Sequence, residues 1–588
     1  MKEFFKYCGA TVVGILVLGL VSLLLSLLTL GALVSAGGED TDVKDGAVLR
    51  ISLNGQLSER AKDNPLGKLT GDDRFESQGL DEILAALKEA ATNDKVSGVY
   101  LDCGAFGADY AQMQELRKAV ADFKKSKKFV VAYADTYTQG AYYVASVADR
   151  VYINPEGMLD WHGIASQPIF FTDLMKKVGV KMQVFKVGTF KSAVEPFILT
   201  GMSDANRQQV QSYISDIWKG VCADVAASRK LSADSVNAYA DKYCIFAATT
   251  DYAKMGLVDS LAYVDGVRAA LRTLSKSDKV SFVSPSALAK LAKPAKSSNT
   301  VAVYYAEGDI VDKARGGAFG GGVSQIVGKD VVADLDELAN DDDVKAVVLR
   351  VNSGGGSAYA SEQMWHAVQL LRQKKPVVVS MSGMAASGGY YMSCGADYIV
   401  ADAGTLTGSI GIFGMIPDVS GLMTEKLGLH FDVVKTNASS DFGAMGRGFN
   451  AAEGAAMQGY VNRGYALFLK RVAAGRGMKT EDVDKIAQGR VWTGSQALKI
   501  KLVDKLGTLD DAIAVAASRA KLKDYKVGKY PAQKSMFEDL MSTATKHDYL
   551  ESSLRAALGE YYAPLSFVGT LSGRDRIQAR IPYVPNLK

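Results

Sequence analysis

Short apolar runs rich in β-branched residues alternate along most of the chain with amphipathic stretches. Each run has the length of a buried strand, and the stretch after it has the spacing of a helix with one apolar face. The same succession occurs twice, and each time it ends in a glycine-containing turn and a further helix. This pattern predicts βαβ units and parallel sheets, and therefore an α/β fold. The predicted strands cover 48–53, 98–101 and 129–132 in the first half, and 301–305, 346–351 and 377–380 in the second.

The two halves of this pattern are copies of one another. Residues 129–164 and 377–412 align at a constant offset of 248 residues, which pairs Val130 with Val378. A period this long excludes a short solenoid repeat and favours duplication of a whole domain. The residues of the first copy that meet identical residues in the second are Val130, Val131, Gly140, Tyr142, Tyr143, Ala148, Asp149, Gly163 and Ile164.

The duplication sets the expected domain boundaries. We expect a first repeat at 47–275, a basic, turn-rich linker at 276–298, and a second repeat at 299–520. Residues 521–588 show no counterpart in the first repeat, and we interpret them as a C-terminal extension with an amphipathic helix near 536–562.

The N-terminus carries a long uncharged run at 7–38. Its apolar core, 11–35, would extend roughly 37 Å as a helix, which is enough to cross a bilayer. We therefore expect residues 1–38 to form a membrane anchor. The alternative is a cleaved signal peptide, because small residues at 34–36 could serve a cleavage enzyme. Basic residues precede the run and acidic residues follow it, which predicts a cytoplasmic N-terminus and a body outside the cytoplasm. These residues are Lys2 and Lys6, then Glu39, Asp40 and Asp42.

Composition narrows the function classes. The 588 residues are 48% apolar and 22% charged, as in an ordinary globular protein. A net charge of +4 is too balanced for a dedicated nucleic-acid binder. The five cysteines show no metal-ligand spacing, and their number is odd, so neither a zinc module nor a disulfide framework is expected. We expect no metal and no cofactor.

Two motifs of the second copy could carry chemistry. Residues 349–357 read LRVNSGGGS directly after a predicted strand, so backbone N–H groups could line an oxyanion hole, unless the glycines form only a tight turn. Ser387 lies in MAASGGY, between a strand and a helix, where small neighbours allow a sharp turn that exposes its hydroxyl. The N–H of Gly388, at the start of that helix, could then stabilise an oxyanion. The alternative is that Ser387 only caps the helix.

A nucleophilic serine needs a base. None of the four histidines, His162, His366, His430 and His547, is favoured by its position. A lysine would need its pKa lowered by roughly 3 units, or about 4 kcal/mol. Burial in an apolar pocket can produce such a shift.

The motifs RVNSGGGSAYASE, MAASGGYYMS, TLTGSIGIFG and VGTFKSAVEPF together resemble the signal peptide peptidase A family, in its long bacterial (protease IV) form, within the Clp protease/crotonase superfamily. The resemblance runs from the anchor to about residue 520. It implies a tandem duplication of a Clp protease/crotonase-like domain behind one transmembrane helix. It also implies that Ser387 is the nucleophile, Lys191 the general base and Ser409 a residue that orients the lysine amine. One departure is that Gly354 replaces the usual proline of the glycine loop, so the second oxyanion donor, Gly355 or Gly356, stays open.

The alignment of the copies supports a division of labour. At the offset of 248, Ser387 meets Gln139 and Ser409 meets Trp161. With one inserted residue Lys191 meets Ser440, whereas Lys186 meets another lysine, Lys435. Each copy would therefore hold half of one site. Without the resemblance, Lys191 would be interpreted as a solvated surface lysine.

The expected function is a membrane-anchored serine endopeptidase with a Ser–Lys dyad. By resemblance, it degrades remnant signal peptides at the bacterial inner membrane as a homotetramer, with peptides and the membrane, but no nucleic acid, as partners. Two alternatives stay open. One is a crotonase-type acyl-CoA enzyme, and the other is a non-catalytic membrane scaffold with a decayed protease fold.

Overall fold

The computed structural model describes residues 43–61, 77–292, 295–314, 324–533 and 577–580, together with four helical positions near the N-terminus. In these parts of the chain, no helix is both long and apolar enough to cross a membrane. The predicted span at 11–35 lies outside the described residues except for those four positions. They are Leu18, Gly19, Val21 and Ser22.

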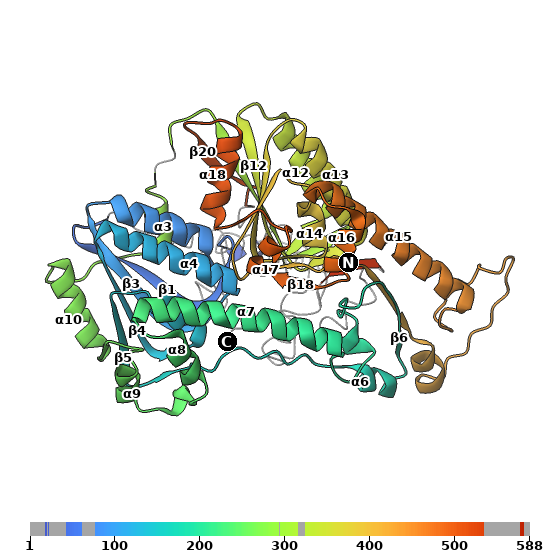
Figure 1. Cartoon of the computed structure of the whole chain (residues 1–588), viewed down its shortest axis with the longest axis horizontal. Helices are drawn as coiled ribbons and strands as arrows, with labels where there is room; N and C mark the ends of the chain where they lie inside the picture. Colours follow the sequence, from blue (N-terminus) through green and yellow to red (C-terminus); the bar gives the residue numbers. More distant parts are fainter. Residues whose placement is uncertain are drawn as a thin grey trace, which may run out of the picture.

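The first repeat is a parallel sheet covered by helices, drawn in blue to green in Figure 1. Its strands follow the order β2-β1-β3-β4-β5-β7, and β8 also pairs with β1. The strands are β1 (Ala47–Ser58), β2 (Ser77–Gly79), β3 (Val96–Gly107), β4 (Phe129–Tyr137), β5 (Arg150–Leu159), β7 (Ser260–Leu261) and β8 (Phe282–Val283). The helices are α3 (Leu80–Thr92), α4 (Tyr110–Phe123), α5 (Gln139–Ala145), α7 (Asp204–Arg229), α8 (Ala233–Ala240), α9 (Thr249–Lys254), α10 (Val264–Ser275) and α11 (Pro285–Ala289).

The second repeat has a similar construction, in yellow-green to red in Figure 1, and its sheet is parallel except that β18 pairs antiparallel with β16. Its path is β18-β16-β14-β12-β9-β20, with β15 beside β14 and β19 beside β15. The strands are β9 (Thr300–Glu307), β12 (Val344–Ser353), β14 (Val377–Ala386), β15 (Tyr398–Ala401), β16 (Leu406–Gly408), β18 (Val491–Thr493), β19 (Lys505–Leu506) and β20 (Lys526–Tyr530). The helices are α12 (Gly328–Asn340), α13 (Ala358–Arg372), α14 (Gly388–Ser393), α15 (Ala451–Arg476), α16 (Thr480–Ile486), α17 (Gly494–Lys499) and α18 (Leu509–Arg519).

Equivalent hydrogen bonds show that the two repeats are one fold. A buried tyrosine hydroxyl of the helix after the third strand donates to a distant carbonyl in both: Tyr142 to Leu257 at 2.7 Å, and Tyr390 to Leu502 at 2.8 Å. The long helices α7 and α15 each have 26 residues. The predicted α/β fold with parallel sheets and an internal duplication is therefore confirmed.

Local sequence signals fix the ends of the long helix α15. The Asn450 side chain accepts from the Glu453 N–H, and the Glu453 side chain accepts from the Asn450 N–H, so the first turn is capped reciprocally. The helix ends where Gly477 takes φ 62°, a conformation that glycine adopts without steric cost. The cap and the glycine together determine where this helix begins and ends.

The boundaries between the repeats look different from the sequence expectation in two places. The stretch predicted as a linker, 276–298, contains β8 and α11, and β8 adds to the first sheet beside β1. The extension predicted at 521–588 begins with β20, which pairs with β9 as β8 pairs with β1. The start of the extension therefore does have a counterpart in the first repeat, which the sequence alignment missed because the two strands share few residues. The helix predicted near 536–562 lies outside the described residues.

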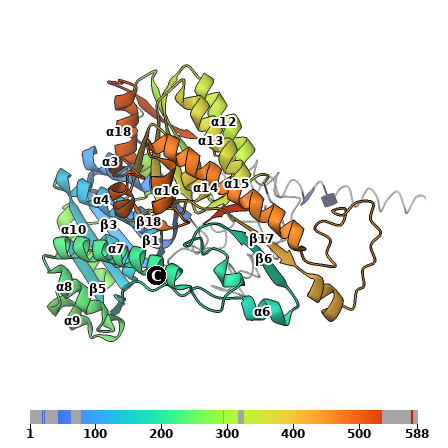
Figure 2. The same ribbon diagram turned by 45° about the vertical axis from the view of Figure 1, so that its right-hand side comes forward.

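A third, mixed sheet joins the two repeats and was not predicted. Its order is β11-β10-β13-β21-β17-β6. Strand β6 belongs to the first repeat and pairs antiparallel with β17 of the second, so that Lys186 lies opposite Phe413 (Figure 2). The first repeat thus reaches across to the second at this sheet. The bounds are β6 (Lys181–Lys186), β10 (Asp309–Val311), β11 (Gln325–Val327), β13 (Gly355–Ser357), β17 (Phe413–Asp418) and β21 (Ile577–Arg580), and the short helix α6 (Thr172–Lys177) precedes β6.

Candidate active site

Ser387 occupies the sharp turn between β14 and α14. Its backbone has φ 55° and ψ −111°, a conformation that costs a residue with a side chain about 1–3 kcal/mol. The Ser387 N–H donates to the Gly408 carbonyl at 2.8 Å, which fixes the turn against β16. Although Ser387 stands at the N-cap position of α14, its side chain makes no capping hydrogen bond. The hydroxyl is therefore left for another partner.

That partner is Lys191, which the first repeat delivers. The chain leaves β6 and runs along the second repeat, where the Phe190 N–H donates to the Gln488 carbonyl at 2.8 Å. Gly489, with φ 78°, makes the approach possible, because a Cβ there would lie 2.6 Å from Lys191 Cβ. Lys191 is fully buried, as is Ser387.

The Lys191 amine lies at the centre of a compact polar site. Its Nζ is 2.7 Å from Ser387 Oγ. It also donates to the carbonyl oxygen and to Oγ of Ser409, each at 3.1 Å. Burial lowers the pKa of Lys191 well below its usual value. None of these three partner atoms belongs to a carboxylate, so no opposite charge in direct contact offsets the desolvation of the charged amine.

Ser409 is held in a turn of its own. It follows β16 with φ 48°, and its N–H donates to the Arg490 carbonyl at 2.7 Å. This backbone conformation turns both oxygens of Ser409 toward the same amine. The structure thus brings together the three residues to which the sequence resemblance gave chemical roles.

The glycine turn after β12 lies against the first turn of α14. A Cβ on Gly389 would approach the Ser353 carbonyl to 2.8 Å, so the two segments are in contact. The Gly355 N–H donates to Ser353 Oγ at 3.1 Å, and Gly356 lies in β13 beside Ile310. Gly388 is the first residue of α14, where an N–H has no acceptor within the helix. Gly388 therefore adjoins Ser387, and the turn that holds Gly355 and Gly356 lies against the same helix.

Two strands flank this site, β13 and β17, and a third strand of the chain is paired between them. β13 follows the glycine turn and β17 follows Ser409. Strand β21, from the C-terminal part of the chain, pairs antiparallel with both. The facing edges of β13 and β17 are therefore occupied by β21 in this structure, and they pair with it as they would with an extended peptide.

Residues that the sequence analysis did not identify hold the lysine loop in place. The Gln209 amide donates to the Phe190 carbonyl at 3.0 Å and to Ser192 Oγ at 2.8 Å, and its oxygen accepts from the Val491 N–H at 3.1 Å. The glutamine thus ties the residues on both sides of Lys191 to the second repeat. No sequence signal marks it, because its partners are distant in the chain.

In the first repeat, the position that aligns with Ser387 is occupied by a glutamine, Gln139. Gln139 accepts from the His162 and Gly163 N–H groups at 3.0 and 2.9 Å, and donates to the Gly163 carbonyl at 2.9 Å. Trp161, opposite Ser409 in the alignment, is fully buried. The first repeat therefore has packing where the second has reactive groups.

Other candidate chemistry is not assembled in the described part of the chain. There, none of the histidines hydrogen-bonds to Ser387, and His162 instead contacts Asp160 at 2.7 Å. The described ranges also contain no group of acidic, histidine or cysteine side chains that could hold a metal ion. Their four cysteines, Cys103, Cys222, Cys244 and Cys394, are buried free thiols.

Comparisons with known proteins identify the family of the chain. The model of peptidase family S49 matches residues 122–278 and 369–523, one segment in each repeat, and the Clp protease model matches 305–400. The chain is 36% identical to a "Protease 4" of Salmonella typhi, over 96% of this chain and 92% of the relative. It is 34% identical to a "Protease 4" of Haemophilus influenzae, with 87% and 86% covered. A "Putative signal peptide peptidase SppA" of Enterococcus faecium is 32% identical over 45% of this chain and 77% of its own length. With matches of this extent in both repeats, the chain belongs to peptidase family S49.

Proposed function

We propose that this protein is a serine endopeptidase that uses a dyad of Ser387 and Lys191. The observation that carries the proposal is the 2.7 Å contact between Lys191 Nζ and Ser387 Oγ, inside a site from which both side chains are withdrawn from solvent. This distance is within the range needed for direct proton transfer. The lowered pKa of Lys191 supplies the neutral amine that a base requires.

The proposed reaction is an acyl transfer. Lys191 takes the Ser387 proton as Oγ attacks the peptide carbonyl, and the N–H of Gly388 and one N–H of the glycine turn stabilise the oxyanion. The candidates for this second donor are Gly356 and Gly355, and the Gly355 N–H would first have to leave Ser353 Oγ, to which it donates in this structure. The protonated amine then gives its proton to the leaving nitrogen, and a water molecule attacks the acyl-enzyme with Lys191 again as base. Ser409 keeps the amine aimed at Oγ through its own two oxygens. Each oxyanion donor contributes about 2.7–4 kcal/mol in enzymes of this kind.

The proposed substrates are peptides bound in extended form along β13 and β17. The pairing of β21 with both strands supports this mode of binding, in which a substrate takes the place of β21. Remnant signal peptides are the proposed natural substrates, in line with the name of the Enterococcus faecium relative. Such apolar peptides reach the enzyme from a membrane, and residues 1–38 are proposed to anchor it there.

The proposed location is the bacterial inner membrane, with the body outside the cytoplasm and the chains assembled as homotetramers. The charges that flank the uncharged run at 7–38 support this orientation. Protease added to spheroplasts is expected to digest the body. A body that stays intact until the membrane is lysed would contradict the orientation.

The test of the proposed activity is digestion of casein and of a synthetic signal peptide by the purified full chain. The wild type is expected to release fragments, and Ser387→Ala is expected to release none. Fragments of equal amount from both would contradict the proposal. Labelling with a serine-directed phosphonate separates a peptidase from an acyl-CoA enzyme, which needs no nucleophilic serine.

A further inference from the structure

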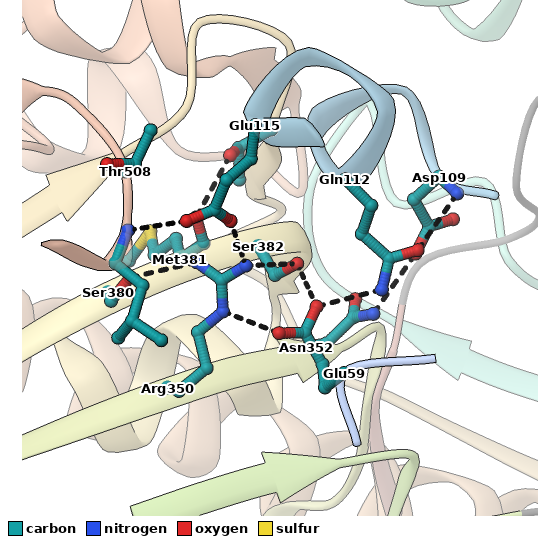
Figure 3. Close-up of polar contacts among 12 residues, drawn as sticks. Glu59, Asp109, Gln112, Glu115, Arg350, Asn352, Ser380, Met381, Ser382 and Thr508 are labelled. Carbon is teal, nitrogen blue, oxygen red and sulfur yellow. Dashed lines mark hydrogen bonds and ion pairs between the residues drawn. The ribbon is translucent and has the colours of Figure 1, made fainter. Parts of the chain in front are cut away.

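A buried ion cluster crosses the boundary between the two repeats (Figure 3). At its centre is Arg350 of β12, only 1% exposed. Its Nε lies 2.7 Å from Glu59 Oε2, and its Nη2 lies 2.6 Å from Glu115 Oε2. Glu59 follows β1 and Glu115 lies on α4, so both carboxylates belong to the first repeat. One guanidinium of the second repeat therefore holds two carboxylates of the first.

The charges of this cluster depend on each other. Burial acts to lower the pKa of Arg350, but Glu115 and Glu59 outweigh it and raise that pKa. Burial likewise acts to raise the pKa of Glu59, but the charge and hydrogen bonds of Arg350 outweigh it and lower that pKa. Arg350 and Glu59 therefore each favour the charged form of the other. Removal of one partner would leave an uncompensated charge in the interior.

The Arg350 guanidinium also hydrogen-bonds to side chains of β14, the strand that leads to Ser387. Arg350 donates to Ser380 Oγ at 3.0 Å and to Ser382 Oγ at 3.1 Å, and the Ser382 hydroxyl donates in turn to Glu59. Both serines lie on β14, and the turn with Ser387 begins at the end of this strand. The position of that turn is thus tied to the first repeat.

A second bridge acts on the glycine turn. The Asn352 side chain donates to Asp109 Oδ2 at 3.1 Å and accepts from the Met384 N–H at 3.0 Å. Asn352 lies at the end of β12, just before the glycines, and Met384 lies just before the nucleophile turn. Asp109 precedes α4 of the first repeat. One amide therefore joins both segments of the site to the other repeat.

These residues are divided between the copies as the reactive groups are. At the offset of 248, Arg350 meets Asp102 and Asn352 meets Gly104. Glu115 meets Gln363. Because Asp102 stands where the second repeat has Arg350, the first repeat has no cation at this position that could form an equivalent cluster with the second repeat.

We propose that these five residues, Glu59, Asp109, Glu115, Arg350 and Asn352, form an inter-repeat clamp that sets the distance between Ser387 and Lys191. The lysine comes from the first repeat and the serine from the second, so this distance depends on how the repeats are held. The clamp residues are positioning residues, because none contacts a reacting atom. The inference rests on the proposed peptidase function.

The first test is Arg350→Lys in the full chain, with the synthetic signal peptide as substrate. Lysine keeps the positive charge but cannot span both carboxylates. We expect kcat to fall between roughly tenfold and a hundredfold, with KM changed less than about twofold. The lower-pH limb of the kcat/KM profile should move to higher pH, because a loosened site lets water reach Lys191 and raises its pKa.

The matched control is Arg476→Lys. Arg476 is another buried arginine, 7% exposed in its side chain, but its partner Asp504 belongs to the same repeat. The thermal midpoint of this variant is expected to fall, while its kcat and pH profile stay at wild-type values. The control separates loss of an ion pair in general from loss of the clamp.

The second test exchanges the amide and the carboxylate of the hydrogen-bonded pair Asn352 and Asp109. Asn352→Asp places a second carboxylate beside Asp109, and kcat is expected to fall roughly tenfold or more. Asp109→Asn restores an amide–carboxylate pair in the double variant, and asparagine caps helices as well as aspartate does. The double variant is therefore expected to recover kcat to within about threefold of wild type.

The outcomes separate the clamp from the proposed function. A wild type that neither cleaves peptide nor labels with phosphonate would overturn the peptidase assignment, and the clamp with it. An active wild type together with Arg350→Lys of unchanged kcat and pH profile would overturn the clamp alone. Failure of the double variant to recover more activity than Asn352→Asp would likewise contradict it.

Discussion

The two repeats share a fold but differ at one junction between a strand and the next helix. This junction joins β4 to α5 in the first repeat and β14 to α14 in the second. In the second repeat Ser387 stands at this junction in a strained conformation, with φ 55°. In the first repeat the helix begins one residue earlier in the alignment, at Gln139, and Thr138 caps it with ordinary extended backbone. The comparison shows that the strain belongs to the site and not to the fold, because the same architecture forms without it.

The first repeat supplies the lysine that the second repeat lacks. This lysine comes from a segment outside the sheet that the two repeats have in common. The segment with Lys191 follows β6, which pairs with the other repeat and not with its own sheet. The corresponding segment of the second repeat, around Ser440, is exposed. Loss of the nucleophile in one copy and of the lysine in the other therefore left a single composite site.

The largest expected effect on activity comes from substitution of the two reacting residues, Ser387 and Lys191. Ser387→Ala and Lys191→Arg should each lower kcat/KM for peptide cleavage at least about a thousandfold, the latter because arginine stays protonated. Lys186→Arg, on β6 beside the same loop, is the matched control and should retain wild-type activity. Near wild-type cleavage by Lys191→Arg would mean that the base lies elsewhere.

Co-expression of two inactive variants, one without the lysine and one without the serine, tests whether the composite site forms within one chain. Co-expression of Lys191→Ala with Ser387→Ala chains should give no activity, because the 2.7 Å contact joins residues of a single chain. Peptidase activity recovered in the mixture would show instead that one chain's lysine serves its neighbour's serine.

A smaller effect is expected on stability and its pH dependence. Between the lowered pKa of Lys191 and the unfolded value of about 10.4, the unfolded chain binds more protons, so the free energy of unfolding rises with pH. Lys191→Met removes this titration. The variant should therefore be more stable than wild type at neutral pH, by an amount that shrinks as pH rises toward 10. Urea unfolding at several pH values measures this difference, and a gap independent of pH would contradict a buried neutral lysine.

The smallest effect on activity is expected at the filled position of the first repeat. Gln139→Ser recreates a serine there but removes the acceptor of the His162 and Gly163 N–H groups, which should cost about 1–3 kcal/mol of stability. Peptidase activity per folded chain should stay unchanged, because this repeat has no glycine turn. A second reactive serine in this variant would contradict the view that the whole site was lost.

Much of the fold could be predicted from the sequence because its signals are local. Apolar runs and helical spacing lie within single elements, and the duplication shows each of them twice. Ser387 could be proposed from its small neighbours for the same reason. The mixed sheet was missed because its pairings, such as Lys186 with Phe413, join segments that are far apart in the chain.

Lys191 marks the limit of prediction from residue pattern alone. Its neighbourhood has no periodicity that indicates burial, and a solitary lysine is usually exposed. Only the resemblance of its motif to a family pointed to it. Arg350 was missed for a related reason, since it interrupts an apolar strand and its carboxylate partners come from the other repeat.

The most direct test of the composite site is labelling with a serine-directed phosphonate, followed by peptide mapping. One adduct per chain is expected, on Ser387, formed at a rate that rises with pH through a midpoint well below the value of about 10.4 for a free lysine. Lys191→Arg should form almost none. An adduct on another residue, or labelling of Lys191→Arg at the wild-type rate, would contradict the claim that the two repeats together make one Ser–Lys site.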